Sequence, residues 1–335
     1  MKAVPVEINW HTGMPIFASE KFLKSVGDEY GWLGGFDAAE ELCCVLPYTI
    51  LHKAMLRMVR FRIETIPTDG VLDIQAEKSF LNSVVDYFRT VGVDLIIPAS
   101  NNAIFRTFPD GADAAPYGSY VVDLRQPEHI IWQQIHKKMC QNILTARKNG
   151  IVVQDDTDHL KNGYELIRDT FKKSNLPFIS YRSLERFVRG LSENCRLMTA
   201  NYQGGIQSYI IFAYSNYCAY AVYGGSINEQ QPGAIKLLCW EAMRAFKQLG
   251  VQRFDFYGTR IKPEDGSKQA GISSFKQRFG AQLKSGYMWK YSFNSVKYSL
   301  YTVLSRLRSG GDIVDAERHK LIDFNSESNI SQFQV

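Results

Sequence analysis

Hydrophobic positions along the chain change repeatedly between the two-residue spacing of β-strands and the three- to four-residue spacing of amphipathic helices. Residues 41–51 and 53–67 are rich in alternating apolar side chains and predict strands. Residues 73–100 have the pattern of an amphipathic helix followed by a buried strand, an order typical of α/β proteins. Ser19 is a suitable N-cap for a helix that we expect to end at Gly31.

A similar order of elements follows in the second half. One long helix is expected over 126–150, because basic residues fill its last turn and Gly150 accepts the left-handed conformation of a helix end. The pattern then predicts two helices, a three-stranded meander, a helix and a strand, over residues 155–175, 183–194, 195–226, 232–250 and 251–259. This order outlines a fold like that of the GCN5-related N-acetyltransferases (GNAT). Its recurrence predicts an α/β chain of tandem GNAT-like domains, each a mixed, mostly antiparallel sheet flanked by helices.

Composition narrows the class of protein. A length of 335 residues with 45% hydrophobic side chains fits two folded domains, and a net charge of +5 permits a polyanionic partner without requiring one. The six cysteines form no C-x-x-C pair, which favours free thiols in a reducing compartment. The six histidines have no metal-binding spacing, so no metal is expected. No apolar run has the length of a signal peptide or a membrane span, and we expect a cytoplasmic protein.

The stretch "GISSFKQRFG" at 271–280 places one lysine between two aromatic rings. Phe275 and Phe279 are four residues apart, so on a helix they share a face and can pack into the core. Lys276 would then be fixed beside them, with Gly280 ending the turn. A fixed ammonium group suits the oxyanion formed during acyl transfer. The alternative is a surface lysine whose stem lies along an amphipathic helix.

Four stretches, taken in order, resemble one family. They are "IHKKMCQNILTARKNGIVV", "AYAVYGGS", "LLCWEAMRAFKQLGVQRFDFYGT" and "GISSFKQRFG". Each resembles a motif of the Fem-type (FemABX) peptidyltransferases, which build the interpeptide bridges of peptidoglycan. The order and spacing agree over roughly 120–283, about half the chain.

The resemblance implies a tandem GNAT-like fold and an enzyme. Such enzymes move an amino acid from an aminoacyl-tRNA to the stem-peptide amine of a peptidoglycan precursor, lipid-linked or UDP-linked, without a cofactor or a metal. A peripheral contact with the inner face of the membrane is compatible with these partners. The implied domains are 1–140, with 290–335 as the segment that could complete it, and 141–289, which carries the F-K-x-x-F-G motif.

The resemblance also marks candidate site residues. It places the family's functional pair on Phe275 and Lys276, as the catalytic residues, and a precursor-binding tyrosine on Tyr223. Arg182 is a weaker candidate for a precursor phosphate or carboxylate, because a guanidinium matches both in geometry. Asp255 could orient the acceptor amine or simply hold the end of its strand. Each also has a structural alternative: a sheet aromatic for Tyr223 and a solvated helix start for Arg182.

Lysines and arginines at Lys137, Lys138, Arg147 and Lys148 form a basic patch that could meet tRNA or precursor phosphates, or could be a solvated face. The family pattern is broken here. Cys140 stands where the family has an arginine, and Leu144 and Thr145 stand at two further positions that are basic in the family.

Two other functions compete with Fem-type transfer. A GNAT-type N-acyltransferase using acyl-CoA or another acyl donor would share the fold. However, "NEQQPGAIKLL" lacks the glycine pair of a pyrophosphate loop, and its Pro232 has no N–H to donate. The third reading is a non-catalytic module that binds a cell-wall precursor.

Overall fold

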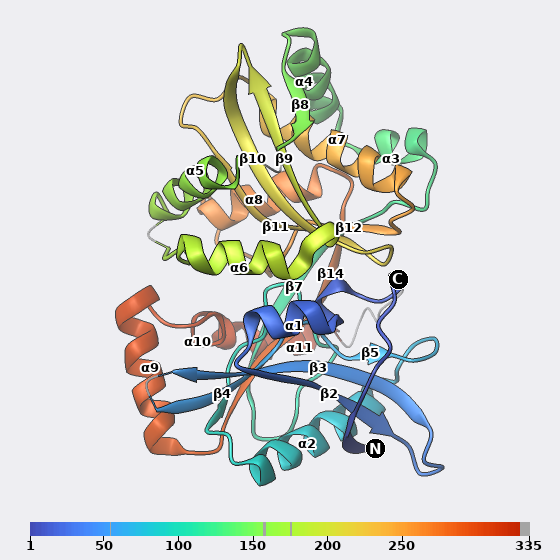
Figure 1. Ribbon diagram of the computed structural model, residues 1–335, viewed down its shortest axis with the longest axis vertical. Helices are drawn as coiled ribbons and strands as arrows, with labels where there is room; N and C mark the ends of the chain where they lie inside the picture. The colour runs from blue at the N-terminus through green and yellow to red at the C-terminus, as the bar shows by residue number, and fades with distance from the viewer. Residues whose placement is uncertain (54, 157–158, 175, 329–335) are drawn as a thin grey trace.

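The computed structural model describes residues 1–53, 55–156, 159–174 and 176–328. A 14-stranded sheet runs through the whole molecule (Figure 1). In order across the sheet, its strands are β1 (Lys2–Val6), β2 (Glu29–Phe36), β3 (Leu42–Lys53), β4 (Leu56–Phe61), β6 (Leu95–Ile96), β14 (Gln282–Ser292), β7 (Asp113–Asp123), β12 (Arg253–Asp255), β11 (Ala219–Ser226), β10 (Gly205–Tyr214), β9 (Cys195–Tyr202) and β8 (Val152–Asp155). Two short strands lie off this path, β5 (Ile66–Pro67) beside β3 and β13 (Thr259–Arg260) beside β7.

Helices cover both halves of this sheet. They are α1 (Glu20–Val26), α2 (Ile74–Val91), α3 (Glu128–Gln134), α4 (Lys137–Lys148), α5 (Leu160–Lys172), α6 (Tyr181–Leu191), α7 (Ala234–Gln248), α8 (Lys268–Gln277), α9 (Ser295–Ser309), α10 (Ile313–Glu317) and α11 (Leu321–Ser328). In Figure 1, α1, α2 and α9 to α11 lie with β1 to β6 in the lower half, and α3 to α8 lie with β8 to β12 in the upper half.

The two halves are joined by long strands and by a shared core. β14 pairs with β7 from Gln282 to Lys290 and with β6 at Tyr291 and Ser292, so it belongs to both halves. One hydrophobic cluster also packs Phe17 and Leu23 from the N-terminal segment against side chains of β9 to β11. A division into domains near residue 140 therefore stays a proposal.

Most elements expected from the sequence are present. The predicted strands correspond to β3 and β4, the predicted helix and buried strand to α2 and β6, and the predicted meander to β9, β10 and β11. The α2 helix begins because the Asp73 carboxylate accepts hydrogen bonds from two backbone N–H groups, and it ends at Gly92 in the left-handed conformation. In the described part of the chain, no helix is long and apolar enough to cross a membrane.

Two helix boundaries were predicted wrongly. The first helix begins after Ser19 as expected, but it ends at Gly27 instead of Gly31, because β2 already pairs with β3 from Glu29 onward. Gly27 permits this close approach, since a side chain there would come within 2.7 Å of Thr49 and of the Glu29 carbonyl oxygen.

The predicted long helix over 126–150 is two helices, α3 and α4, with a break at Ile135 in an extended conformation. The His136 side chain accepts from the Lys138 N–H and caps α4, and the His136 N–H donates to the Arg278 carbonyl at 2.8 Å. The break thus docks the start of α4 against the end of α8, a contact between distant residues that the local pattern does not contain.

Candidate active site

The α8 helix is held at both ends and along one face. Ser267 caps its start by accepting from the Ala270 N–H at 3.1 Å. The Phe275 and Phe279 rings pack edge to face with centroids 5.3 Å apart, and Phe279 is fully buried. Gly280 follows with a φ of +74°, and a side chain there would come within 2.7 Å of Gln134 in α3. The predicted aromatic packing around Lys276 is therefore present.

Lys276 is buried, with only 7% of its surface exposed. Its ammonium group donates to the carbonyl oxygens of Tyr257, at 3.2 Å, and Gly258. An ammonium group has three N–H donors, and the third has no partner among the described residues. Burial lowers the lysine pKa to about 8, and the negative charge of Asp255 opposes this shift. The side chain is thus a buried cation with one free donor, and it differs in this from a surface lysine.

The turn that binds Lys276 is itself fixed by Asp255. The buried Asp255 carboxylate accepts from the Ser119 hydroxyl and, at 2.6 Å, from the Tyr257 N–H. The Ser119 oxygen in turn accepts from the Gly258 N–H at 3.1 Å. Tyr257 and Gly258 both have positive φ, 59° and 65°, which is an uncommon conformation for tyrosine and is associated with functional sites. Burial raises the Asp255 pKa. Asp255 supports the turn, and its contact with an acceptor amine stays a prediction.

Tyr223 is within electrostatic reach of two arginines that the sequence analysis missed, Arg60 and Arg62. Its ring packs edge to face against Phe178 at 5.2 Å, and burial raises its pKa while Arg62 and Arg60 of the β4 segment oppose the shift. The Arg62 guanidinium donates to the Thr49 hydroxyl and the Val26 carbonyl oxygen. The signal in the sequence was their spacing of two at the end of a mostly apolar strand, since Arg60 lies in β4 and Arg62 follows its last residue, Phe61.

Although the negative charge of Asp312 opposes the lowering of the Arg60 pKa by burial, neither arginine forms an ion pair with a carboxylate of the described residues. The Arg60 Nε is buried without any hydrogen-bond partner there, and burial lowers the Arg62 pKa to about 9. Both interact electrostatically with Tyr223 and Tyr257, and the latter also binds Lys276 through its carbonyl oxygen. The pair of guanidinium groups is suited to an anion.

Arg182 is apart from these groups. It is exposed in the first turn of α6, whose start is capped by the Ser180 side chain. No contact in the described ranges joins it to Lys276, Tyr223 or the strand arginines, so its role in binding a precursor anion stays a prediction.

A pocket of about 330 Å³ opens between α4, α7 and α8. Its lining residues are Lys138, Met139, Asn142, Lys236, Gly271, Ser274, Phe275 and Arg278. Three are cationic and none is acidic. Burial lowers the pKa of Lys236, and the positive charges of Arg278 and Lys138 lower it further. No described residue forms an ion pair with any of the three. Phe275 lines this pocket while the adjacent Lys276 points to the turn at Tyr257.

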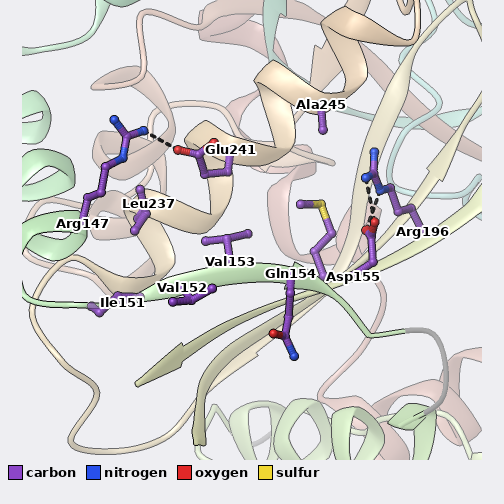
Figure 2. A pocket seen from close by; sticks show the side chains of 11 residues that line it. Arg147, Ile151, Val152, Val153, Gln154, Asp155, Arg196, Leu237, Glu241 and Ala245 are labelled. Carbon is purple, nitrogen blue, oxygen red and sulfur yellow. Dashed lines mark hydrogen bonds and ion pairs between the residues drawn. The ribbon is translucent and has the colours of Figure 1, made fainter. Parts of the chain in front are cut away.

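A second pocket, of about 370 Å³, has balanced charges. Figure 2 shows that Arg147 reaches Glu241 and that Arg196 forms a bidentate pair with Asp155. Because each arginine has a carboxylate partner, this pocket is poorly suited to an anion. The basic patch predicted on α4 is therefore divided: Lys138 lines the first pocket, while Arg147 turns to Glu241.

The α4 backbone packs closely against Gly233, the N-cap residue of α7. A side chain at Gly233 would come within 2.5 Å of the Asn142 carbonyl oxygen, so the α4 backbone lies directly against this helix start. Pro232 offers no N–H. The segment before α7 therefore lacks one backbone donor that a pyrophosphate loop could use.

No protein-family model matches the sequence, and no curated protein matches it in sequence. Solved structures do match in fold. FemX superposes with a TM-score of 0.62 at 14% identity, covering 87% of this chain and 94% of FemX. L-PGS from Bacillus licheniformis superposes with a TM-score of 0.50 at 10% identity, covering 87% of this chain and 92% of L-PGS. The C-terminal domain of a protein named as a lysylphosphatidylglycerol synthetase, from Agrobacterium fabrum, superposes with a TM-score of 0.51 at 12% identity, covering 88% of this chain and 93% of that domain.

At these identities, the comparisons establish the fold. The chain has the Fem-type, tandem GNAT-like α/β fold that the sequence motifs predicted. The resemblance first noted over half the chain thus extends, as a fold, over most of it.

Proposed function

We propose that this protein is a transferase of the Fem type, which moves an amino acid from an aminoacyl-tRNA to the stem-peptide amine of a peptidoglycan precursor. The observation that carries the proposal is the buried Lys276 ammonium group, which the carbonyl oxygens of the Tyr257–Gly258 turn hold and whose third donor has no partner in the described part of the chain. The Fem-type fold supports the same assignment.

The reaction is the aminolysis of an ester. The acceptor amine forms a C–N bond to the ester carbonyl, and the carbonyl oxygen becomes an oxyanion. The free N–H of Lys276 donates to that oxyanion, a contact of a kind that contributes about 10²–10³ in rate. Collapse then breaks the bond to the tRNA ribose oxygen, which takes up the proton that the amine loses. No general base is assigned.

The donor phosphates are proposed to bind in the pocket between α4, α7 and α8. Its three cations lack acidic partners among the described residues. Phe275 lines the pocket, and Lys276 is the next residue in the sequence. Side-chain cations of this kind suit the phosphodiester groups of RNA. The acyl-CoA alternative is disfavoured, because the segment before α7 lacks the glycine pair of a pyrophosphate loop and Pro232 there has no N–H to donate.

The acceptor is proposed to bind beside Arg60, Arg62 and Tyr223. Its diphosphate or a stem-peptide carboxylate would form an ion pair with these guanidinium groups, which form none with a described residue, and would reach the Arg60 Nε, which has no described hydrogen-bond partner. The precursor is lipid-linked or UDP-linked, and either carries this chemistry.

The donor is tested with a labelled RNA helix that carries the 3′ acceptor end of tRNA. Lys236→Ala should weaken the binding of this RNA about tenfold. It should also reduce the slope of log affinity against log salt concentration by the amount expected for the loss of about one phosphate contact. Lys137→Ala is the matched control, because Lys137 is an exposed α4 lysine outside the pocket. Equal effects of the two substitutions, or displacement of the RNA by CoA at similar affinity, would contradict the proposed donor.

The class of reaction is tested separately in extracts. Ribonuclease treatment should remove the transfer activity, and removal of CoA should leave it intact. The reverse result would assign the protein to the acyl-CoA alternative, and a chain that binds precursor without transferring would be the non-catalytic module.

A further inference from the structure

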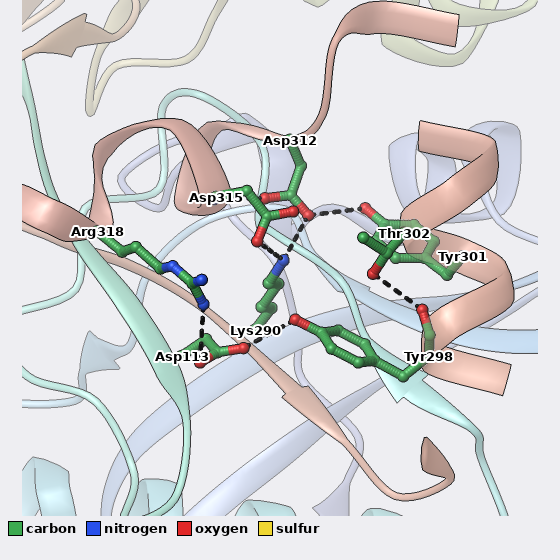
Figure 3. A network of polar contacts seen from close by, with 8 residues as sticks. All are labelled: Asp113, Lys290, Tyr298, Tyr301, Thr302, Asp312, Asp315 and Arg318. Carbon is green, nitrogen blue, oxygen red and sulfur yellow. Dashed lines mark hydrogen bonds and ion pairs between the residues drawn. The ribbon is translucent and has the colours of Figure 1, made fainter. Parts of the chain in front are cut away.

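The α9 helix has its polar face turned inward and its apolar face turned outward. Its caps are Asn294, whose side chain accepts from the Lys297 N–H, and the left-handed Gly310. On the inner face, Lys297 forms an ion pair with Asp94 at 2.8 Å and the Tyr298 hydroxyl donates to Asp113 at 2.8 Å. Figure 3 shows the second of these contacts within a larger polar network.

That network fixes the helix to the sheet. The buried Lys290 of β14 binds Asp312 at 3.0 Å and Asp315 at 2.7 Å, and the Tyr301 hydroxyl donates to the same Asp312 (Figure 3). Tyr298 and Tyr301 also pack on a small hydrophobic cluster of β4 and β6. Because the helix is anchored through its polar side, its apolar side chains cannot turn inward without breaking these contacts.

The outer face is a continuous apolar stripe. It consists of Val296, Leu300, Val303, Leu304 and Leu307. The spacing of four, three, one and three residues keeps these side chains on one side of a helix about 22 Å long. Val296 is 78% exposed and Leu307 is 82% exposed. Monomeric proteins rarely expose such a contiguous stripe without a partner.

The charge of α9 indicates which partner. The helix contains no acidic residue, its Arg306 side chain is exposed, and the whole chain carries a net charge of +5. A neighbouring turn adds the 89% exposed Met55; the hairpin that carries it also contributes to the cluster that holds Tyr298 and Tyr301. An apolar stripe beside an exposed cation, on a helix without acidic residues, is typical of helices that lie in the surface of an anionic bilayer.

We propose that α9 docks this protein on an anionic membrane surface. The apolar stripe would enter the boundary between head groups and acyl chains, while the exposed Arg306 meets lipid phosphates. A second copy of the chain fits less well, because a symmetric pairing through α9 would bring identical cationic helices together. The proposal rests on the proposed function in one respect: it favours the lipid-linked precursor as the acceptor.

Sedimentation of the purified full chain with vesicles tests this docking. The probe is a vesicle of phosphatidylcholine with about 30 mol% phosphatidylglycerol, compared with phosphatidylcholine alone. We expect binding to the anionic vesicles only, weakened by salt, and weakened about tenfold by V303S combined with L307S. Ile322→Ser is the matched control, because Ile322 is an 81% exposed apolar residue on α11.

Equal sedimentation of wild type and the double variant, or no binding by wild type, would overturn the docking proposal. A wild-type dimer in analytical ultracentrifugation, together with a monomeric double variant, would also overturn it, because this face would then bind a second copy of the chain. Vesicle binding needs neither donor nor acceptor, so its outcome is independent of the transfer reaction. Conversely, an unchanged melting temperature and unchanged transfer to a UDP-linked acceptor would show that the double variant is folded and active.

Discussion

At the scale of single residues, the free-energy cost of keeping Lys276 charged indicates whether the side chain has a structural or a functional role. Lowering a lysine pKa from 10.5 to about 8 corresponds to about 3 kcal/mol against the charged form. A buried cation of that cost, with a free donor, is poorly explained as a stabilising contact. It is better explained as a group that an anion satisfies during the reaction, since charge developing beside it would recover part of that free energy.

The pH dependence of transfer distinguishes two roles for this lysine. If the charged form acts, its contribution is complete below the folded-state pKa and is lost as the pH rises through about 8. The Lys276→Arg variant keeps its charge through this range, and the ratio of wild-type to variant kcat/KM cancels the titration of the acceptor amine. We expect this ratio to fall above about pH 8. A ratio that rises instead would mean that the neutral lysine acts as a base.

At the scale of elements, the end of α8 sets the position of the candidate site. Gly280 takes a left-handed conformation directly against the last residue of α3, and the adjoining break between α3 and α4 bonds to the Arg278 carbonyl oxygen. The Phe275 side of α8 and the Lys138 side of α4 face one pocket because of this junction.

Gly280→Ala should disturb this junction. The new methyl group would meet the Gln134 backbone in a strained conformation, and we expect a loss of about 1–3 kcal/mol in the free energy of unfolding, with reduced transfer. Urea denaturation measures the change. Gly271→Ala is the matched control on the same helix, where the added methyl meets open space and should stabilise by up to about 1 kcal/mol. Equal stability of the two variants would show that the junction does not need glycine.

Sequence patterns predicted these elements well where local signals decide them. The start of α1 after Ser19, the meander of β9 to β11 and the aromatic packing around Lys276 follow from nearby residues. The break at Ile135 was missed because its cause is a hydrogen bond to Arg278, which is far away in the sequence. The role of Asp255 in the turn depends in the same way on Ser119.

At the scale of the whole molecule, the candidate site combines distant parts of the chain. Arg60 and Arg62 come from one half, while Tyr223, Tyr257 and Lys276 come from the other, and the electrostatic contacts among the first four cross between them. The local pattern could not predict this pairing, because no short stretch contains both sets. It follows from the shared sheet and from the core that joins the halves.

The most direct measurement is mass spectrometry of peptidoglycan from cells in which the gene is deleted, wild type or Lys276→Met. The methionine keeps the aliphatic volume, and we expect it to change the free energy of unfolding by no more than about 1 kcal/mol, because lost hydrogen bonds are offset by removal of a desolvated charge. The interpeptide bridge should be missing or shortened in peptidoglycan from the deletion cells. It should also be missing or shortened in cells that contain the variant at the same protein level as wild type. Peptidoglycan unchanged by deletion would contradict the proposed reaction, and an intact bridge in Lys276→Met alone would contradict the role of the ammonium group.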